Sequence, residues 1–222
     1  MYGIRVIVLL AAAGLAQAAE PAGGAKVGIC YNYGCAREGV VRYAAAELDG
    51  LAARLDTART AAEERALLGE AVGRLYRLAG GQIPVGADRS GNYLDGGADG
   101  RMDCIDHSTS TTRLLKLLES RGALRFHRVG EPERRTWFIL QHFSAVIEEL
   151  TLAERLERLP PGSALARCNC TEDGLMVEGP EGEEAPGAGE RYAVDSWFVD
   201  NGEAAVVLPL AEWLNGGGPN VQ

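Results

Sequence analysis

The spacing of apolar residues changes from helical to strand-like near Gly122, and this order limits the folds open to the 222-residue chain. Three segments carry apolar side chains at helical spacing: Glu38–Leu55, Arg59–Leu78 and Asp103–Ser120. The β-rich stretches come afterwards, at Ala123–Val129, Thr136–Leu150 and Tyr192–Val199, with Ala204–Leu208 as a fourth candidate. Helices followed by strands predict an α+β fold in which N-terminal helices precede an antiparallel sheet.

The remaining segments are expected to be connections. Gly28–Gly39 is predicted to be a short loop that carries two cysteines, and Gly86–Gly100 a polar, glycine-rich loop. Leu152–Leu159 fits a short helix that Pro160 ends. The residues that follow, about 160–190, are acidic and rich in glycine and proline, which predicts an exposed insertion. The sequence contains no internal repeat, so residues 20–222 are expected to form one domain.

The N-terminal segment Met1–Ala19 has the composition of a secretory signal peptide. It combines one basic residue, Arg5, with an apolar run over Val6–Leu15 and small residues at its end. A membrane anchor is the alternative, but the run is short for a bilayer span and no charged stop follows it. We therefore expect a periplasmic or secreted protein that has no membrane span after signal cleavage and that can keep disulfides.

The charge balance excludes one class of partner. The chain has 31 acidic and 22 basic residues, a net charge of -9, so no basic surface is predicted that would offset nucleic-acid phosphates. We expect no nucleic-acid binding.

The five cysteines cannot all pair within one chain. An odd cysteine in an exported protein is either an intermolecular partner or a reactive thiol. Cys168 and Cys170 are expected to cross-link to Cys30 and Cys35, because a bond within Cys168-Asn169-Cys170 would be strained. A soft metal such as copper at Cys168 and Cys170, as in a metal chaperone, is the alternative. Cys104 is the residue that these pairings leave over.

Cys104 lies at the predicted start of a helix. Asp103 is a candidate N-cap, and Asp106 three residues later completes a capping box. The helix dipole should lower the pKa of a thiol at this position, whereas the adjacent carboxylates act in the opposite direction, and the sequence does not decide between them. A nucleophile is favoured here over a buried structural cysteine or a disulfide partner.

A thiol nucleophile needs a base and a group that orients the base. His142 interrupts an apolar strand, and Asp195 interrupts the next one, so pairing of these strands would bring the two side chains together. A structural histidine is the alternative. His107 is poorly angled to accept a proton from Cys104 on the same helix, and His127 is compatible with a solvated strand position.

This order of Cys, His and Asp resembles the transglutaminase-like cysteine peptidase superfamily, whose core is papain-like. It is most similar to the bacterial transglutaminase-like cysteine proteinases, with a glycine-rich approach to an Asp-Cys-x-Asp motif, here Gly96–Asp106, before a leucine-rich helix. The resemblance covers roughly Gly81–Asp200. It implies that Cys104 is the nucleophile, His142 the base and Asp195 the orienting acid. The insertion after Leu150 departs from the family's pattern.

Two further groups of residues could assist such a site. The backbone N–H of Cys104 is one candidate oxyanion donor, and the side-chain amide of Gln141 or Gln82 is another. No cofactor is required, but calcium is possible at four acids spaced as in a calcium loop, which some members of the resembled family also use: Asp95, Asp99, Asp103 and Asp106. A solvated loop rich in Gly and Asp is the alternative.

The resulting functional hypothesis is an exported cysteine peptidase or transglutaminase-like amide hydrolase. Its substrate would be a protein or peptide, including peptidoglycan peptides, because all of these present an amide carbonyl to the thiol. The alternative hypothesis is a non-catalytic envelope protein that has the same fold and binds a peptide or protein partner.

Overall fold

The computed structural model describes residues 23–91, 97–138, 140–158, 187 and 189–219. The predicted signal peptide, Met1–Ala19, and most of the predicted insertion lie outside the described residues, and so do Cys168 and Cys170. Among the described residues, no helix combines the length and apolar content needed to cross a bilayer.

The described chain begins with a β-hairpin, which the sequence did not predict. Strands β1 (Ala25–Tyr31) and β2 (Arg37–Tyr43) pair antiparallel, so the prediction of a loop over Gly28–Gly39 is wrong. The predicted helix over Glu38–Leu55 is wrong in its first third, since helix α1 covers only Ala45–Asp56. Val41 and Tyr43 are buried whereas Arg42 is exposed, an alternation of period two that a helical reading of the same apolar residues overlooks.

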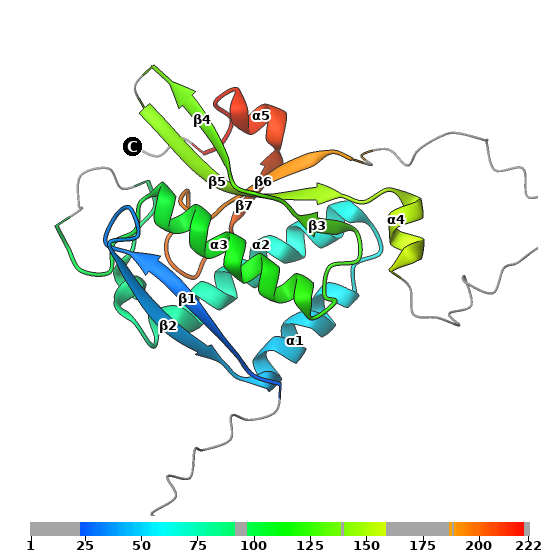
Figure 1. The fold of residues 1–222 in the computed structure, drawn as a ribbon, viewed down its shortest axis with the longest axis horizontal. Helices are drawn as coiled ribbons and strands as arrows, with labels where there is room; N and C mark the ends of the chain where they lie inside the picture. Colours follow the sequence, from blue (N-terminus) through cyan, green and yellow to red (C-terminus); the bar gives the residue numbers. More distant parts are fainter. Residues whose placement is uncertain (1–22, 92–96, 139, 159–186, 188, 220–222) are drawn as a thin grey trace, which may run out of the picture.

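The next two predicted helices are confirmed. Helix α2 (Ala61–Gly80) begins at Thr60, whose side chain accepts a hydrogen bond from the backbone N–H of Glu63. A short 3-10 helix, η1 (Pro84–Ala87), follows it. Helix α3 (Cys104–Ser120) contacts both β1 and the central strand β5 (Leu140–Glu149), and Figure 1 shows it crossing the middle of the molecule.

The second half of the chain forms an antiparallel sheet, as predicted. Its strands are β3 (His127–Val129), β4 (Glu133–Trp137), β5, β6 (Arg191–Asp195) and β7 (Val206–Pro209), in the order β3-β5-β6-β7 with β4 also paired to β5. The predicted strand over Thr136–Leu150 is two strands, divided at Phe138, whose φ is 55°. Helix α4 (Leu152–Glu157) matches the expected short helix, and helix α5 (Leu210–Leu214) was not predicted.

Two apolar clusters hold these elements together. The larger one joins the hairpin, α1, α2, α3 and one face of the sheet, and includes Tyr43, Leu68, Leu114 and Ile147. The smaller one lies where α5 packs against β6. It consists of Val146, Ala193, Trp197, Phe198, Leu210 and Trp213. The molecule is therefore an α+β fold with a hairpin, rather than a helix, as its first described element.

Candidate active site

The start of α3 is built as a capping box, as the sequence predicted. Oδ1 of Asp103 accepts the N–H groups of Ile105 and Asp106, at 3.0 and 2.9 Å. Oδ2 of Asp106 accepts the N–H of Asp103 at 3.2 Å. These bonds satisfy backbone donors that a helix start leaves unpaired. Cys104 is the first residue of this helix.

The β1–β2 loop binds the same two carboxylates. The N–H groups of Tyr33 and Cys35 donate to Asp106 at 2.8 and 2.6 Å, and that of Gly34 donates to Asp103 at 2.9 Å. Tyr33 and Cys35 have φ values of 66° and 58°, and such left-handed residues form concave arrays of N–H groups that bind anions. Burial raises the pKa of the Asp106 carboxyl to about 6, and the nearby Asp103 carboxylate raises it in the same direction.

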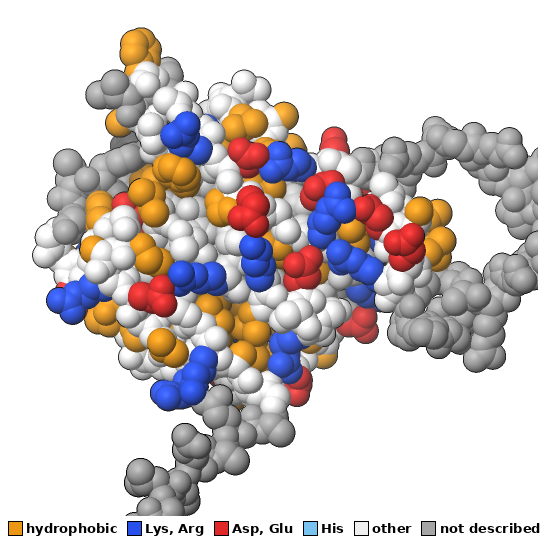
Figure 2. All heavy atoms as spheres, in the orientation of Figure 1, with side chains coloured by type: hydrophobic (Ala, Val, Ile, Leu, Met, Phe, Trp, Pro, Cys, Tyr) orange, Lys and Arg blue, Asp and Glu red, His pale blue; other side chains and the backbone are white. Residues whose placement is uncertain are grey.

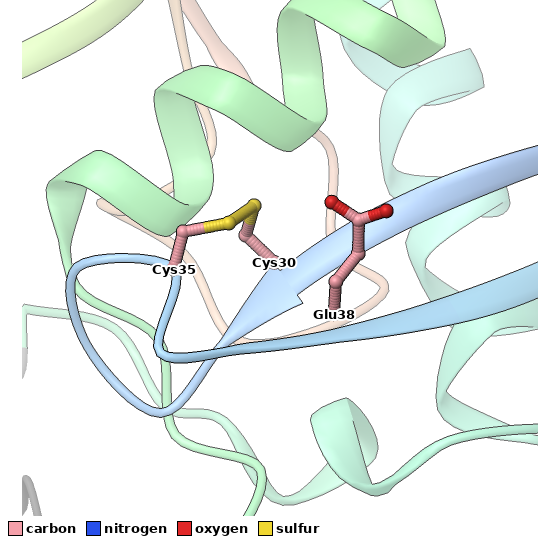
Figure 3. A group of neighbouring side chains, drawn as sticks. All are labelled: Cys30, Cys35 and Glu38. Carbon is pink, nitrogen blue, oxygen red and sulfur yellow. A yellow bond between two sulfur atoms is a disulfide. The ribbon is translucent and has the colours of Figure 1, made fainter.

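A disulfide closes this loop. Cys30 and Cys35, five residues apart, are bonded to each other (Figure 3), so the predicted cross-links from both to Cys168 and Cys170 are wrong. Pairing within a hairpin needs no contact with a distant segment. Glu38 lies beside the disulfide, but its carboxylate forms an ion pair with Arg113 at 2.7 Å. An oxidised pair offers no thiolate to a cation, so these three side chains do not form a metal centre in this state.

His142 and Asp195 form a buried hydrogen-bonded pair. Nε2 of His142 lies 2.7 Å from Oδ2 of Asp195, and the two residues are 8% and 2% exposed. The pair forms because β5 and β6 are neighbours, with Ala145 opposite Val194. Asp195 also accepts the indole N–H of Trp213 at 2.8 Å and the backbone N–H of Trp197 at 3.2 Å. The carboxylate is therefore fixed by three donors.

Aromatic rings surround the histidine. The ring centroids of Trp197, Phe198 and Trp213 lie 4.7, 5.5 and 5.6 Å from that of His142. Trp213 comes from α5, which the sequence did not predict, and its hydrogen bond to Asp195 had no detectable sequence signal. The apolar surroundings exclude water from the pair, which strengthens the hydrogen bond between them.

Cys104 is the free cysteine among the described residues, and its thiol lies against the strand that carries His142. The Sγ–H donates to the backbone carbonyl of Gln141 at 3.9 Å. The side chain also packs against the smaller apolar cluster, which includes Trp197. Because Nε2 of His142 is bound to Asp195, Nδ1 is the ring nitrogen that can accept a proton. The structure thus gathers the three predicted triad residues at one end of the sheet.

The sequence left open whether the pKa of the Cys104 thiol is raised or lowered, and the structure indicates that it is raised. Burial raises its pKa to about 11, and the carboxylates of Asp103 and Asp195 act in the same direction. The backbone N–H groups of Phe143 and Cys104 lower the pKa, but by less. In this structure the residue is a neutral thiol at pH 7, and a base must remove its proton before or during attack.

The raised pKa gives a prediction for the pH dependence of alkylation. Below a pKa of about 11 the thiolate fraction rises as the pH increases, so the rate of Cys104 modification by iodoacetamide should rise about tenfold per unit between about pH 6 and about pH 10. Peptide mass spectrometry would quantify modification at Cys104, with Cys104→Ser as the control for other sites. A rate independent of pH over this range would show that a thiolate is already present.

The two candidate oxyanion amides have different surroundings. The side chain of Gln82 is bound to the backbone of β2, where its Oε1 accepts the N–H of Arg42 and its Nε2 donates to the carbonyl of Arg42, both at 2.9 Å. Gln82 therefore has a structural role in the described contacts. Gln141 is exposed at the start of β5, and its backbone carbonyl, rather than its amide, is what the thiol contacts.

The predicted calcium ligands also have other partners. Asp103 and Asp106 bind the hairpin loop and the helix start, and Oδ1 of Asp99 accepts the side-chain amide of Asn32 at 2.9 Å. Asp95 lies outside the described residues. Calcium binding by these four acids stays a prediction.

The other two histidines are buried, contrary to the solvated position that His127 allowed. His127 is fully buried, with Nδ1 2.8 Å from Oε1 of Glu64, which is also fully buried. His107 lies on α3 with both ring nitrogens hydrogen-bonded, to Asp88 and to Ser196. None of these three contacts was evident from the sequence, because the partners lie 63, 19 and 89 residues away.

Comparisons of the chain with protein-family models, with curated proteins and with solved structures returned no match.

Proposed function

We propose that the protein is a thiol-dependent acyl-transfer enzyme that cleaves amide bonds with Cys104, His142 and Asp195. The observation that carries the proposal is the buried 2.7 Å bond between His142 and Asp195, formed beside a strand backbone that contacts a free helix-start thiol. The resemblance of Gly96–Asp106 to the motif of the transglutaminase-like cysteine peptidases supports the same roles and a papain-like core.

Each residue has a defined task in the proposed reaction. Nδ1 of His142 takes the thiol proton as Sγ of Cys104 attacks the carbonyl carbon, and Asp195 holds the Nε2–H and stabilises the imidazolium that forms. The backbone N–H of Cys104 is a candidate donor to the developing oxyanion. His142 then protonates the leaving amine, leaving a thioester. Water, activated by His142, hydrolyses the thioester, and an amine in its place would give transamidation.

The surroundings favour an exported enzyme that acts on proteins or peptides. The Cys30–Cys35 disulfide is of the kind that persists in oxidising compartments, which agrees with the signal-peptide pattern and with a periplasmic or secreted location. Figure 2 shows acidic and basic side chains interspersed over one face, without a basic area suited to nucleic acid. Several basic residues of the described chain are paired with acidic ones, such as Lys116 with Glu131 and Arg121 with Asp49. Peptidoglycan peptides fall within the same substrate class.

The proposal is tested with a panel of peptidyl acyloxymethyl ketones, which modify cysteines efficiently only where a catalytic base assists. We expect one adduct, at Cys104, and a decrease in the inactivation rate of at least about 100-fold for His142→Ala, the usual share of a general base. Circular dichroism would check that the variant is folded. Iodoacetamide at high pH should still modify Cys104 in His142→Ala. Equal modification of wild type and His142→Ala by the peptidyl probes would exclude the proposed mechanism.

The rival function is a non-catalytic envelope protein that binds a peptide or protein partner. The raised pKa of the Cys104 thiol is the observation in its favour, since a neutral thiol is also what an inert buried cysteine has. The rival predicts no His142-dependent adduct and an unchanged cellular phenotype for Cys104→Ser.

A further inference from the structure

A second hydrogen-bonded group lies behind Cys104, on the buried side of α3. His107 is three residues after Cys104 and is 4% exposed. Its Nε2 lies 2.9 Å from Oδ2 of Asp88, and its Nδ1 lies 2.8 Å from Oγ of Ser196. Both nitrogens are engaged away from the thiol, so His107 does not compete with His142 as the base.

The direction of these hydrogen bonds follows from the buried carboxylate. Asp88 is fully buried, and its Oδ1 accepts the backbone N–H of Met102 at 2.9 Å. Its Oδ2 also needs a donor, which only a protonated Nε2 of His107 supplies. In neutral His107, Nδ1 then accepts the hydroxyl of Ser196. Thr111 donates in turn to Ser196, with their oxygens 2.8 Å apart, so every member of the group is satisfied.

Three residues of this group lie close in the chain to residues of the proposed site. Ser196 directly follows Asp195 at the end of β6, and Met102 lies two residues before Cys104. His107 lies on the helical turn that begins at Cys104. The bonds of His107 and Asp88 therefore connect the end of β6, the loop that enters α3 and the first turn of α3. These are the elements whose separation fixes the distance from the thiol to the His142–Asp195 pair.

We propose that His107, held between Asp88 and Ser196, is a positioning residue that sets the separation of Cys104 from the His142–Asp195 pair. This inference rests on the proposed function. Both ring nitrogens of His107 are bonded to other residues and its side chain is buried, so its loss should reduce the rate of the chemical step and leave substrate binding unchanged. Misplacement of reacting groups by about 1 Å lowers rates by about 100-fold.

The test separates the inactivation rate constant, kinact, from the binding constant, KI, for the peptidyl acyloxymethyl ketones. We expect His107→Ala to lower kinact by about 100-fold with KI unchanged. Ser196→Ala, which removes only the hydroxyl, should lower kinact in the same direction. His107→Asn should recover a large part of the loss, because its amide can replace Nδ1 toward Ser196. Iodoacetamide modification of Cys104, which needs no positioned base, should stay close to the wild-type rate.

Tyr43→Phe is the control for a general loss of stability. Its hydroxyl is buried and donates to the carbonyl of Leu75 at 3.3 Å, but it belongs to neither group, so kinact should not change. A wild-type kinact in His107→Ala, or an equal loss in Tyr43→Phe, would overturn the positioning role while the His142-dependent labelling of wild type still stood. Absence of that labelling in wild type would overturn the proposed function and this inference together.

Discussion

Asp195→Ala is expected to reduce kinact/KI for the peptidyl probes by about 10³- to 10⁴-fold, the usual effect of losing the orienting acid of a triad. The carboxylate holds Nε2 of His142, which leaves Nδ1 as the nitrogen that can take a proton, and it is itself fixed by Trp213 and the Trp197 N–H. Alanine removes all three hydrogen bonds, so the imidazole loses both its orientation and its countercharge. The inactivation kinetics of the purified variant provide the measurement.

Asp195→Asn is the matched control. Its amide oxygen can still accept hydrogen bonds from His142 and Trp213. Its amide NH₂ then faces the backbone N–H of Trp197, and because both groups are donors, that hydrogen bond is lost. We expect a smaller loss than for alanine, because the amide oxygen can accept from Nε2 of His142 as the asparagine of Cys-His-Asn triads does. An alanine variant as active as the asparagine variant would show that Asp195 does not orient the base.

Glu64→Ala is expected to cause the largest loss of stability, about 3 to 5 kcal/mol in the free energy of unfolding. Glu64 is fully buried on α2 and accepts the N–H groups of Arg125 and Phe126, at 2.7 and 3.1 Å, and the Nδ1 of His127 at 2.8 Å. Removing the carboxylate leaves these donors buried without partners. It also removes one of the contacts between α2 and the start of β3, where the Arg65–His127 contact at 3.3 Å would remain. Urea denaturation at neutral pH would measure the change.

Glu70→Ala provides the comparison on the same helix. Glu70 is exposed and forms an ion pair with Arg54 at 3.6 Å, so its loss should change the unfolding free energy by less than about 0.5 kcal/mol. A decrease of less than about 1 kcal/mol for Glu64→Ala would mean that water satisfies the freed donors. The 2.8 Å hydrogen bond between His127 and Glu64 would then contribute little to the free energy of unfolding.

The features that the sequence predicted correctly depend on contacts between neighbouring residues. The capping box of Asp103 and Asp106 is a contact between residues three apart, so the position of Cys104 at the start of α3 could be predicted. The apolar strands that contain His142 and Asp195 are consecutive strands in the chain, which made their pairing the natural expectation. The β1–β2 hairpin was missed because Val41 fits the helical spacing of Ala45 and Leu48 as well as the strand alternation in which Val41 and Tyr43 are buried.

The sequence alone therefore determined the α+β class, the helix start at Cys104 and the strand pairing that joins His142 to Asp195, since each rests on local periodicity, capping or strand order. Only the tertiary structure decided the Cys30–Cys35 pairing, the hydrogen bond from Trp213 to Asp195 and the bonds of His107 to Asp88 and Ser196. It also decided that the Cys104 thiol is neutral, because burial and two carboxylates outweigh the backbone N–H groups. These properties depend on which surfaces meet, and a one-dimensional pattern does not contain that information.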